Sequence, residues 1–281
     1  MAPTQMTTSE NKDHWSAETY SASAAFVPKL TQKVLHYLDP QPTERVLDVG
    51  CGDGKFTANF LPHVASVLGI DASPSMIESA KKDYGGANAE FRVVDCRYLD
   101  REGGIVDGTW DKVISNAALH WILKDPNTRL SVLTAIHTSL KPHGGVFIFE
   151  MGSHGNVPEV HTALLAALTH RGATIEQARA ASPWFFPSEH WMRATLEGVG
   201  FRVEKLEVEY RPTKLTAEVG GGIEGWVRLM GAEMLEVLEA GEEREGAVRE
   251  VCEVLESVIT REEDGSRWLG YVRLRGVAVK K

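Results

Sequence analysis

The stretch 45–54, which reads RVLDVGCGDG, holds the residues whose types and spacing most clearly suggest chemistry. Its apolar first half is typical of a strand buried on both faces, and this strand stops abruptly at alternating glycines. Glycine permits positive φ and lets a ligand lie against bare backbone amides. Asp48 lies near the end of the strand, where its carboxylate would repel a phosphate but attract an ammonium or sulfonium group. The stretch also lacks the G-x-G-x-x-G spacing of a dinucleotide site, so it favours a ligand that carries a cation.

Two more acidic residues follow predicted strands further along the chain. Asp71 ends a short apolar run, where a carboxylate can accept both hydroxyls of a ribose. Asp95 and Cys96 follow the predicted strand 90–94 and could hydrogen-bond an adenine amine. With a helix predicted over 55–61, the strand at 45–49 and the glycine turn at 50–54 form the opening of a βαβ unit. These features together predict a nucleoside-like ligand at successive strand ends.

Five motifs resemble, in order and at sensible spacing, those of the class I S-adenosylmethionine-dependent methyltransferases. They read LDVGCGDG, GIDAS, VVDCRYL, WDKVISNAALHW and LKPHGGVFIFE. The resemblance implies S-adenosyl-L-methionine as the cofactor and S-adenosyl-L-homocysteine as the product. It also implies an α/β fold with a Rossmann-like, doubly wound, seven-stranded sheet that is mostly parallel, with the last strand antiparallel and a helical cap formed by insertions.

The resemblance assigns cofactor-binding roles to residues that match these motifs. The glycine turn should hold the methionine end of the cofactor, Asp71 the ribose and Asp95 the adenine. The N-terminal segment resembles the W…Y helix that folds over the cofactor in small-molecule methyltransferases, although its two aromatic residues could instead anchor the helix on the core. No metal ligands are expected. The full set of expected cofactor-binding residues is Trp15, Tyr20, Asp48, Gly50, Cys51, Gly52, Asp71, Ala72, Asp95, Cys96, Asn116 and Ala117.

His120 and Trp121 are the expected catalytic residues. They leave the end of the fourth predicted strand, where open α/β sheets bind ligands. The run NAALHWI resembles the trans-aconitate methyltransferase branch and the juvenile-hormone acid methyltransferase branch, which methylate carboxylates on small molecules. In the second branch the matching tryptophan binds the acceptor carboxylate through its indole N–H. His120 is then either a general base or a polar residue that caps the strand end.

Three later stretches, PWFFPSEHW, RPTKL and GYVRLRGVAVK, resemble the trans-aconitate-methyltransferase-like enzymes of fungi and bacteria. The last stretch alternates apolar and basic residues, which is typical of a half-exposed strand. The resemblance extends over nearly the whole chain, but no distinctive arginine cluster can be assigned to a tricarboxylate. The arginines that remain candidates are Arg171, Arg179, Arg211 and Arg273.

Three functional hypotheses follow from these residues. The first is methylation of a carboxylate oxygen on a small organic molecule by in-line displacement, which needs no general base because a carboxylic acid with a pKa of about 4 is ionised at pH 7. The second is a phenolic O- or amine N-methyltransferase of secondary metabolism, with His120 as the general base for a phenol. The third is a non-catalytic methyltransferase fold that serves as a binding protein. The presence of Asp71 and of an unblocked glycine turn argues against the third.

The composition disfavours several classes of partner. A formal net charge of -9 weighs against a nucleic-acid substrate, because phosphate binding is driven by basic patches. The three cysteines lack metal-ligand spacing, which favours a reducing compartment. The polar start of the chain lacks the apolar core of a signal peptide, and no apolar run reaches membrane-spanning length. We therefore expect a cytoplasmic enzyme that acts on a small-molecule acceptor, without a membrane or nucleic-acid partner.

Pattern and composition divide the chain into three parts. Residues 1–38 are expected to form an N-terminal helical segment that covers the cofactor. The methyltransferase core is expected to combine three ranges, 39–151, 200–213 and 264–281. The aromatic residues of the remaining helical insertions suit a water-poor cap over the carboxyl ends of the strands, and these insertions are 152–199 and 214–263.

Overall fold

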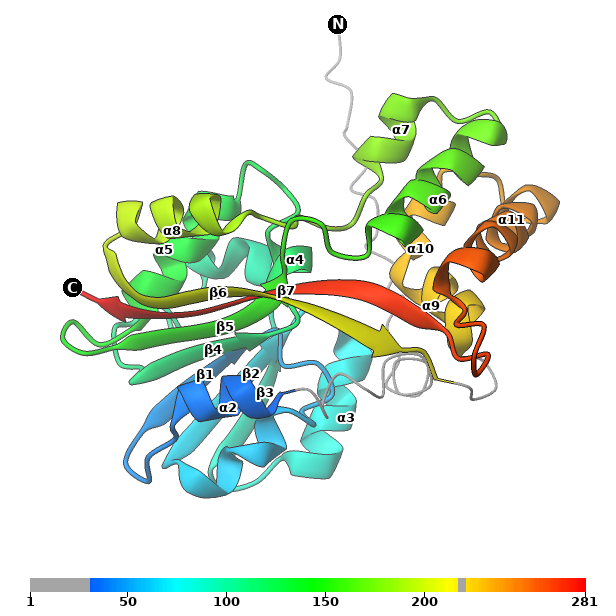
Figure 1. The fold of residues 1–281 in the computed structure, drawn as a ribbon. Helices are drawn as coiled ribbons and strands as arrows, with labels where there is room; N and C mark the ends of the chain where they lie inside the picture. Colours follow the sequence, from blue (N-terminus) through cyan, green and yellow to red (C-terminus); the bar gives the residue numbers. More distant parts are fainter. Residues whose placement is uncertain (1–30, 217–220) are drawn as a thin grey trace, which may run out of the picture.

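The computed structural model describes residues 31–216 and 221–281, which form an α/β fold around one seven-stranded sheet (Figure 1). The strand order is β3-β2-β1-β4-β5-β7-β6. Neighbouring strands from β3 to β5 are parallel, whereas β7 is antiparallel to both β5 and β6. The expected doubly wound sheet with an antiparallel last strand is therefore confirmed. The strands are β1 (Arg45–Val49), β2 (Ser66–Asp71), β3 (Ala89–Val93), β4 (Lys112–Asn116), β5 (Val146–Gly152), β6 (Phe201–Lys214) and β7 (Trp268–Lys280).

The strand order reverses at β1, which lies between β2 and β4. Ligands of open α/β sheets bind in the crevice at such a reversal, outside the carboxyl ends of the strands. The chain leaves β1 through the glycine turn, β2 through Asp71 and β4 through Asn116. Because these strands are parallel, the fold brings these three expected ligand-binding segments to one edge of the sheet.

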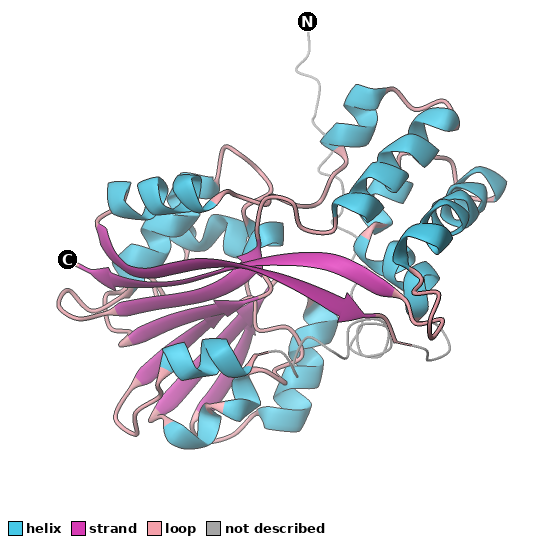
Figure 2. Ribbon diagram, in the orientation of Figure 1, coloured by secondary structure: helices cyan, strands magenta, loops and turns pink. Residues whose placement is uncertain are grey.

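Helices cover both faces of the sheet (Figure 2). Ser73 caps the helix that follows β2 as expected, because its Oγ accepts a hydrogen bond from the Met76 N–H at 3.2 Å. The helix at 32–38 packs Val34 and Leu38 on the apolar core, whereas Trp15 and Tyr20 lie outside the described residues. The helices on the sheet are α2 (Gln32–Leu38), α3 (Pro74–Tyr84), α4 (Leu119–Ile122), α5 (Arg129–Ser139) and α8 (Glu189–Gly198).

The helix predicted over 55–61 is wrong, because this segment forms two short 3-10 turns. These turns are η2 (Thr57–Asn59) and η3 (Leu61–His63), and a third, η4 (Cys96–Arg101), follows β3. The side-chain amide of Asn59 donates to the carbonyl of Lys55 at 2.9 Å and to that of Phe56 at 3.0 Å, which competes with helical backbone bonds. Pro62 then lacks the N–H that a continuing helix would need.

Five helices of the described chain form a bundle beside the sheet. Their buried faces share one apolar cluster, which includes Leu164, Trp226 and Leu255. Figure 1 shows the bundle beyond the end of the sheet at which β6 ends and β7 begins. Both expected insertions contribute to it. The helices are α6 (Pro158–His170), α7 (Ile175–Ala180), α9 (Gly222–Met230), α10 (Ala232–Leu235) and α11 (Glu242–Ile259).

Helix α8 differs from the rest of the insertion 152–199. Its buried residues Met192 and Leu196 join the core of the sheet, where they share a cluster with Phe201. Figure 1 shows α8 beside α5 rather than in the bundle. Only the part of this insertion that contains α6 and α7 belongs to the bundle, because α8 leads directly into β6 and packs on the sheet that β6 extends.

None of the helices in the described ranges combines the length and apolar character that a bilayer crossing requires.

Candidate functional site

The glycine turn after β1 adopts a left-handed backbone. Gly50, Gly52 and Gly54 have φ values of 77°, 55° and 77°. A Cβ at Gly50 would lie 2.2 Å from the Cβ of Ala118, at the start of α4, whereas a Cβ at Gly52 would meet no atom within 4 Å. Gly50 and Gly52 therefore have different structural roles. Gly50 permits the close approach of α4, and Gly52 exposes its backbone to open space at the edge of the sheet.

Asp71 ties the glycine turn to the start of α3. Its Oδ2 accepts the Gly52 N–H and its Oδ1 accepts the Ser73 N–H, both at 2.9 Å. Each carboxylate oxygen has two lone pairs, so these bonds leave capacity for ribose hydroxyls. Ala72 is exposed beside it. The sequence predicts that Asp71 binds a ribose, and this stays a prediction; the structure shows that the same carboxylate orders the turn.

Asp48 is a buried carboxylate with one oxygen that lacks a partner. Its Oδ2 accepts the Thr57 hydroxyl at 2.6 Å, while its Oδ1 is buried without a hydrogen bond in the described part of the chain. Burial is the main cause that raises the pKa of Asp48 to about 7; Asp71 adds to the rise and Thr57 opposes it. A buried oxygen without a partner is costly, so the position suits a ligand that brings a hydrogen-bond donor or a cation.

The end of β4 shows two further features of a ligand site. Asn116 Oδ1 is also buried without a hydrogen bond among the described residues. Ala117 has a φ of 56°, and its N–H donates to the Glu150 carbonyl of β5 at 2.8 Å. A left-handed alanine is strained, and such strain clusters at functional sites. Asn116 and Ala117 therefore lie at the strand edge as expected, with an acceptor oxygen available there.

Asp95 and Cys96 lie after β3, but the carboxylate is already engaged. The Arg97 guanidinium donates to Asp95 Oδ1 at 2.9 Å and to Oδ2 at 2.6 Å. Burial would raise the pKa of Asp95, but its bonds to Arg97 outweigh burial and lower it. An adenine amine would share this carboxylate with Arg97. Burial raises the pKa values of Cys51 and Cys96 well above 9.0, so both remain neutral thiols that pack rather than react.

His120 lies in α4 with its ring fixed against β5. The Gly152 N–H donates to His120 Nδ1 at 3.4 Å, and the Phe185 N–H donates to the His120 carbonyl at 2.8 Å. Burial lowers the pKa of His120 well below its ordinary value of 6.5, and Arg273 lowers it further. The imidazole is therefore neutral at physiological pH.

An aromatic cluster joins α4 to the bundle. Trp121 lies edge-on to Trp184 at 5.8 Å between ring centroids, and Trp184 stacks on Phe186 at 5.9 Å. The indole N–H of Trp226 donates to the Tyr271 hydroxyl at 2.7 Å. The cluster thus places partly buried Trp121 between the strand edge and the helices of the insertions. Its members are His120, Trp121, His161, Trp184, Phe186 and Trp226.

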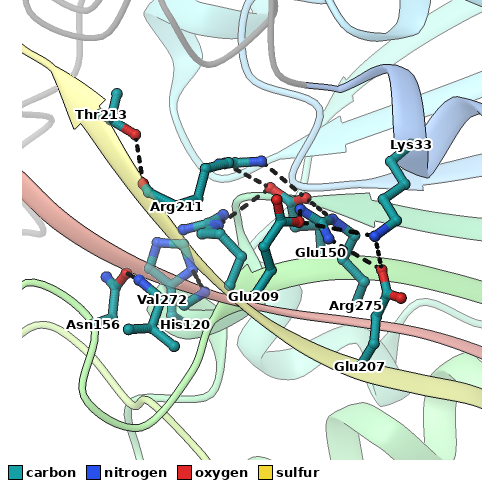
Figure 3. A network of polar contacts seen from close by, with 12 residues as sticks. Lys33, His120, Glu150, Asn156, Glu207, Glu209, Arg211, Thr213, Val272 and Arg275 are labelled. Carbon is teal, nitrogen blue, oxygen red and sulfur yellow. Dashed lines mark hydrogen bonds and ion pairs between the residues drawn. The ribbon is translucent and has the colours of Figure 1, made fainter.

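The structure also reveals an arginine cluster that the sequence did not. Glu150 accepts from Arg211 at 3.2 Å, from Arg273 at 3.2 Å and from Arg275 at 2.5 Å (Figure 3). Arg275 also contacts Glu207 and Glu209, and Lys33 of α2 contacts Glu207. We call Glu150 and its three arginines the Glu150 cluster.

The Glu150 cluster corrects two sequence interpretations. Arg273 and Arg275 are 4% and 1% exposed, so the alternating stretch of β7 is buried and not half-exposed. Of the four candidate arginines, only Arg211 and Arg273 come together; Arg171 pairs with glutamates of α11 and Arg179 is exposed on α7. Alternation along the strand places Arg273 and Arg275 on one face of β7. This spacing was the signal in the sequence that could have indicated the arginine cluster.

Comparison with known proteins decides the family. Residues 46–144 match the family model described as a methyltransferase domain. A protein of Schizosaccharomyces pombe, the uncharacterized methyltransferase C70.08c, is 36% identical over 270 residues, which cover 96% of this chain and 99% of that protein. The chain belongs to the class I S-adenosylmethionine-dependent methyltransferases.

Two further comparisons extend this methyltransferase assignment. The malonyl-[acyl-carrier protein] O-methyltransferase of Acetivibrio thermocellus is 30% identical over 207 residues, which cover 69% of each chain. The structure of a methyltransferase from Thiobacillus denitrificans in complex with S-adenosyl-L-homocysteine has a TM-score of 0.52 and 19% identity, and covers 94% of this chain and 96% of that one. The second likeness shows the shared fold. These comparisons do not confirm the trans-aconitate-like branch.

Proposed function

We propose that this methyltransferase transfers a methyl group from S-adenosylmethionine to a carboxylate oxygen of a small organic acceptor. The observation that carries the proposal is the position of Trp121. This residue lies in α4, just after the carboxyl end of β4, and belongs to the aromatic cluster. An indole N–H there can hold one carboxylate oxygen while the other is methylated. The relative from Acetivibrio thermocellus, an O-methyltransferase of malonyl-[acyl-carrier protein], supports an oxygen acceptor.

The residues at the strand edge fit the cofactor. The unpartnered oxygens of Asp48 and Asn116 are acceptors suited to its ammonium group. Gly52 leaves room for it against the backbone, and Asp71 can bind its ribose. When bound, S-adenosylmethionine supplies an electrophilic methyl group on a sulfonium.

The protein contributes chiefly orientation and exclusion of water. Methyl transfer requires the acceptor oxygen, the methyl carbon and the sulfur to lie nearly in line, and positioning alone can supply much of the rate. The aromatic cluster and the bundle would close the acceptor side with apolar surface. We propose the bundle as the cap predicted from the insertions.

Replacement of Trp121 by phenylalanine tests the acceptor role directly. The variant keeps most of the apolar bulk but loses the N–H, so we expect unchanged cofactor affinity and roughly tenfold to a hundredfold lower turnover, about 1.4–2.8 kcal/mol of barrier. The assay uses methyl-labelled cofactor with a panel of benzoate, phenylacetate, hexanoate, fumarate, phenol and benzylamine, and mass spectrometry identifies the product.

Trp191→Phe is the matched control, because it removes an indole N–H from α8, which packs on the sheet core. This control should leave turnover nearly unchanged. Methyl esters from the acids would support the proposal. Methylation of phenol or benzylamine alone, or full activity of Trp121→Phe on the acid, would overturn it.

Cofactor binding is expected to release a proton from Asp48 near neutral pH. Its pKa of about 7, raised mainly by burial, leaves the carboxyl partly protonated, and a cationic ligand favours the ionised form. Affinity should rise between about pH 6 and pH 8 and level off above that window. In the unbound protein, stability falls as pH rises from 3.8 to about 7, because the folded state retains the proton longer.

Calorimetric titration in phosphate and in Tris at pH 6.5 measures this release as a difference in heat between the two buffers. Asp48→Asn cannot ionise and should show equal heats. If the wild type also shows equal heats in both buffers, Asp48 does not respond to the cofactor.

A further inference from the structure

The backbone of β5 holds the imidazole of His120 on its Nδ1 side. The Gly152 N–H donates to Nδ1 at 3.4 Å, and His120 is only 7% exposed. A Cβ at Gly152 would lie 2.5 Å from the Phe186 ring, so glycine allows this ring to lie against the strand. The centroids of Phe186 and His120 are 5.7 Å apart. The imidazole therefore has a fixed orientation as well as a fixed partner.

The partner of Nδ1 determines which ring nitrogen carries the proton. A backbone N–H can only donate, so Nδ1 must present its lone pair, and the single proton of the neutral ring lies on Nε2. Protonation of Nδ1 would oppose two N–H groups and leave the buried Gly152 amide without its acceptor. Within residues 31–216 and 221–281, no second hydrogen bond to the ring competes with this one.

The charged groups around His120 also oppose its protonation. Arg273 of β7 acts on the ring as a cation, and burial together with this cation holds the pKa well below 6.5. The carboxylate of Glu150 on β5 is engaged by Arg273, by Arg211 of β6 and by Arg275. It is therefore committed to the guanidinium groups. The adjacent Trp121 on α4 is neutral.

We propose that His120 binds the acceptor as a neutral hydrogen-bond donor through Nε2–H and does not act as a general base. This rests on the proposed function, because a carboxylate arrives already ionised and needs donors rather than a base. Trp121 supplies a second neutral N–H, and its ring centroid lies 5.5 Å from that of His120. The carboxylate oxygen that is not methylated has lone pairs for both donors. Neutral donors orient this oxygen and reduce the nucleophilicity of the acceptor less than a cation would.

The tautomer can be measured without any acceptor. We would label histidine with nitrogen-15 and record long-range proton–nitrogen spectra of the full chain with bound S-adenosyl-L-homocysteine from pH 5.5 to 8.5, assigning His120 by its absence in His120→Gln. The expected pattern is the neutral Nε2–H form throughout this range. An Nδ1–H pattern, or a titration of His120 near pH 6.5, would overturn the proposal.

Kinetics separate a donor from a base. On the best acid of the panel, His120→Gln retains an N–H donor and should stay within about fivefold of wild-type kcat/KM, whereas His120→Leu should lose roughly tenfold to a hundredfold. The pH–rate profile of the wild type should contain no ionisation that is missing from the profile of His120→Gln. Equal losses in both variants, with recovery at high pH, would indicate a base and overturn the donor role.

The product distinguishes failure of this inference from failure of the proposed function. A methyl ester product combined with the wrong tautomer refutes the donor role alone. An aryl ether or a methylated amine as the only product refutes carboxylate methylation, and with it the basis of the donor role.

Discussion

Replacement of Gly50 by alanine is expected to abolish cofactor binding, because the new Cβ would lie 2.2 Å from the Cβ of Ala118. Neither atom is the end of a flexible side chain, so the backbone of the turn or of α4 must move. The φ of 77° adds the strain of a left-handed alanine. Overpacking and strain together should lower the free energy of unfolding by roughly 2–5 kcal/mol. Thermal unfolding and calorimetry with S-adenosylmethionine measure the two effects.

Gly52→Ala is the matched control within the same turn. It also has positive φ, at 55°, but its Cβ would meet no atom within 4 Å. The unbound protein should therefore lose only about 1–2 kcal/mol, while cofactor affinity falls at least about tenfold because the methyl group occupies ligand space. Gly50→Ala combined with Ala118→Gly should recover part of the stability lost by Gly50→Ala. If Gly50→Ala binds the cofactor normally, the close contact between the turn and α4 is not required for cofactor binding.

The sequence was most informative where local chemistry determines structure. Glycines in alternation after an apolar run require a left-handed turn, and Ser73 followed by proline marks a helix start. Acidic residues at the ends of parallel strands meet at one edge because the strand order requires it. For these reasons the sheet and the positions of most of the expected residues at the strand ends were predictable, while the binding roles of these residues stay predictions. Trp15 and Tyr20 lie outside the described residues and stay predictions.

Features that depend on partners distant in the chain were less accessible. The sequence placed α8 with the insertion, because its packing against β6 and α5 is not visible in its own residues. The bond from Gly152 to His120 joins residues on separate elements, and no local pattern signals it. The Arg97 side chain that engages Asp95 could have been suspected from its spacing, since the two are neighbours on one turn.

The Glu150 cluster shows most clearly why the alternating residues of β7 predicted the wrong burial. Alternating apolar and basic residues predict a strand with one solvent-exposed face, because arginine is seldom buried without a partner. Here Glu150 of β5 and Glu207 of β6 lie opposite Arg275 in the sheet register and supply the charge that allows burial. The carboxylates come from strands far from β7 in the sequence. Pairing across the sheet therefore reverses the inference from pattern alone.

Replacement of Glu150 by glutamine is expected to lower the free energy of unfolding of the protein more than replacement of any other residue in the ion pairs of this cluster. Glutamine keeps the shape but removes the charge that Arg211, Arg273 and Arg275 share. Arg273, which is only 4% exposed, then loses the carboxylate with which it pairs. Removal of one partner from a buried ion pair costs about 3–5 kcal/mol. Urea unfolding at pH 7 measures this loss. Glu245→Gln is the control, since its pair with Arg228 is exposed to solvent and should contribute much less to stability.

The pH dependence of the same variants separates charge from packing. Burial would raise the pKa of Glu150, but Arg273, Arg211 and Arg275 outweigh it and lower the pKa below its ordinary value of 4.5. A carboxyl whose pKa is lowered by folding contributes stability above its unfolded pKa, and this contribution is lost as pH falls through the folded pKa. Wild-type stability should therefore fall below about pH 4.5, and Glu150→Gln should lose part of this acid dependence. If Glu150→Gln were less stable at pH 7 but kept the full wild-type acid dependence, Glu150 would act through packing, and the arginines would owe their burial to Glu207 and Glu209 instead.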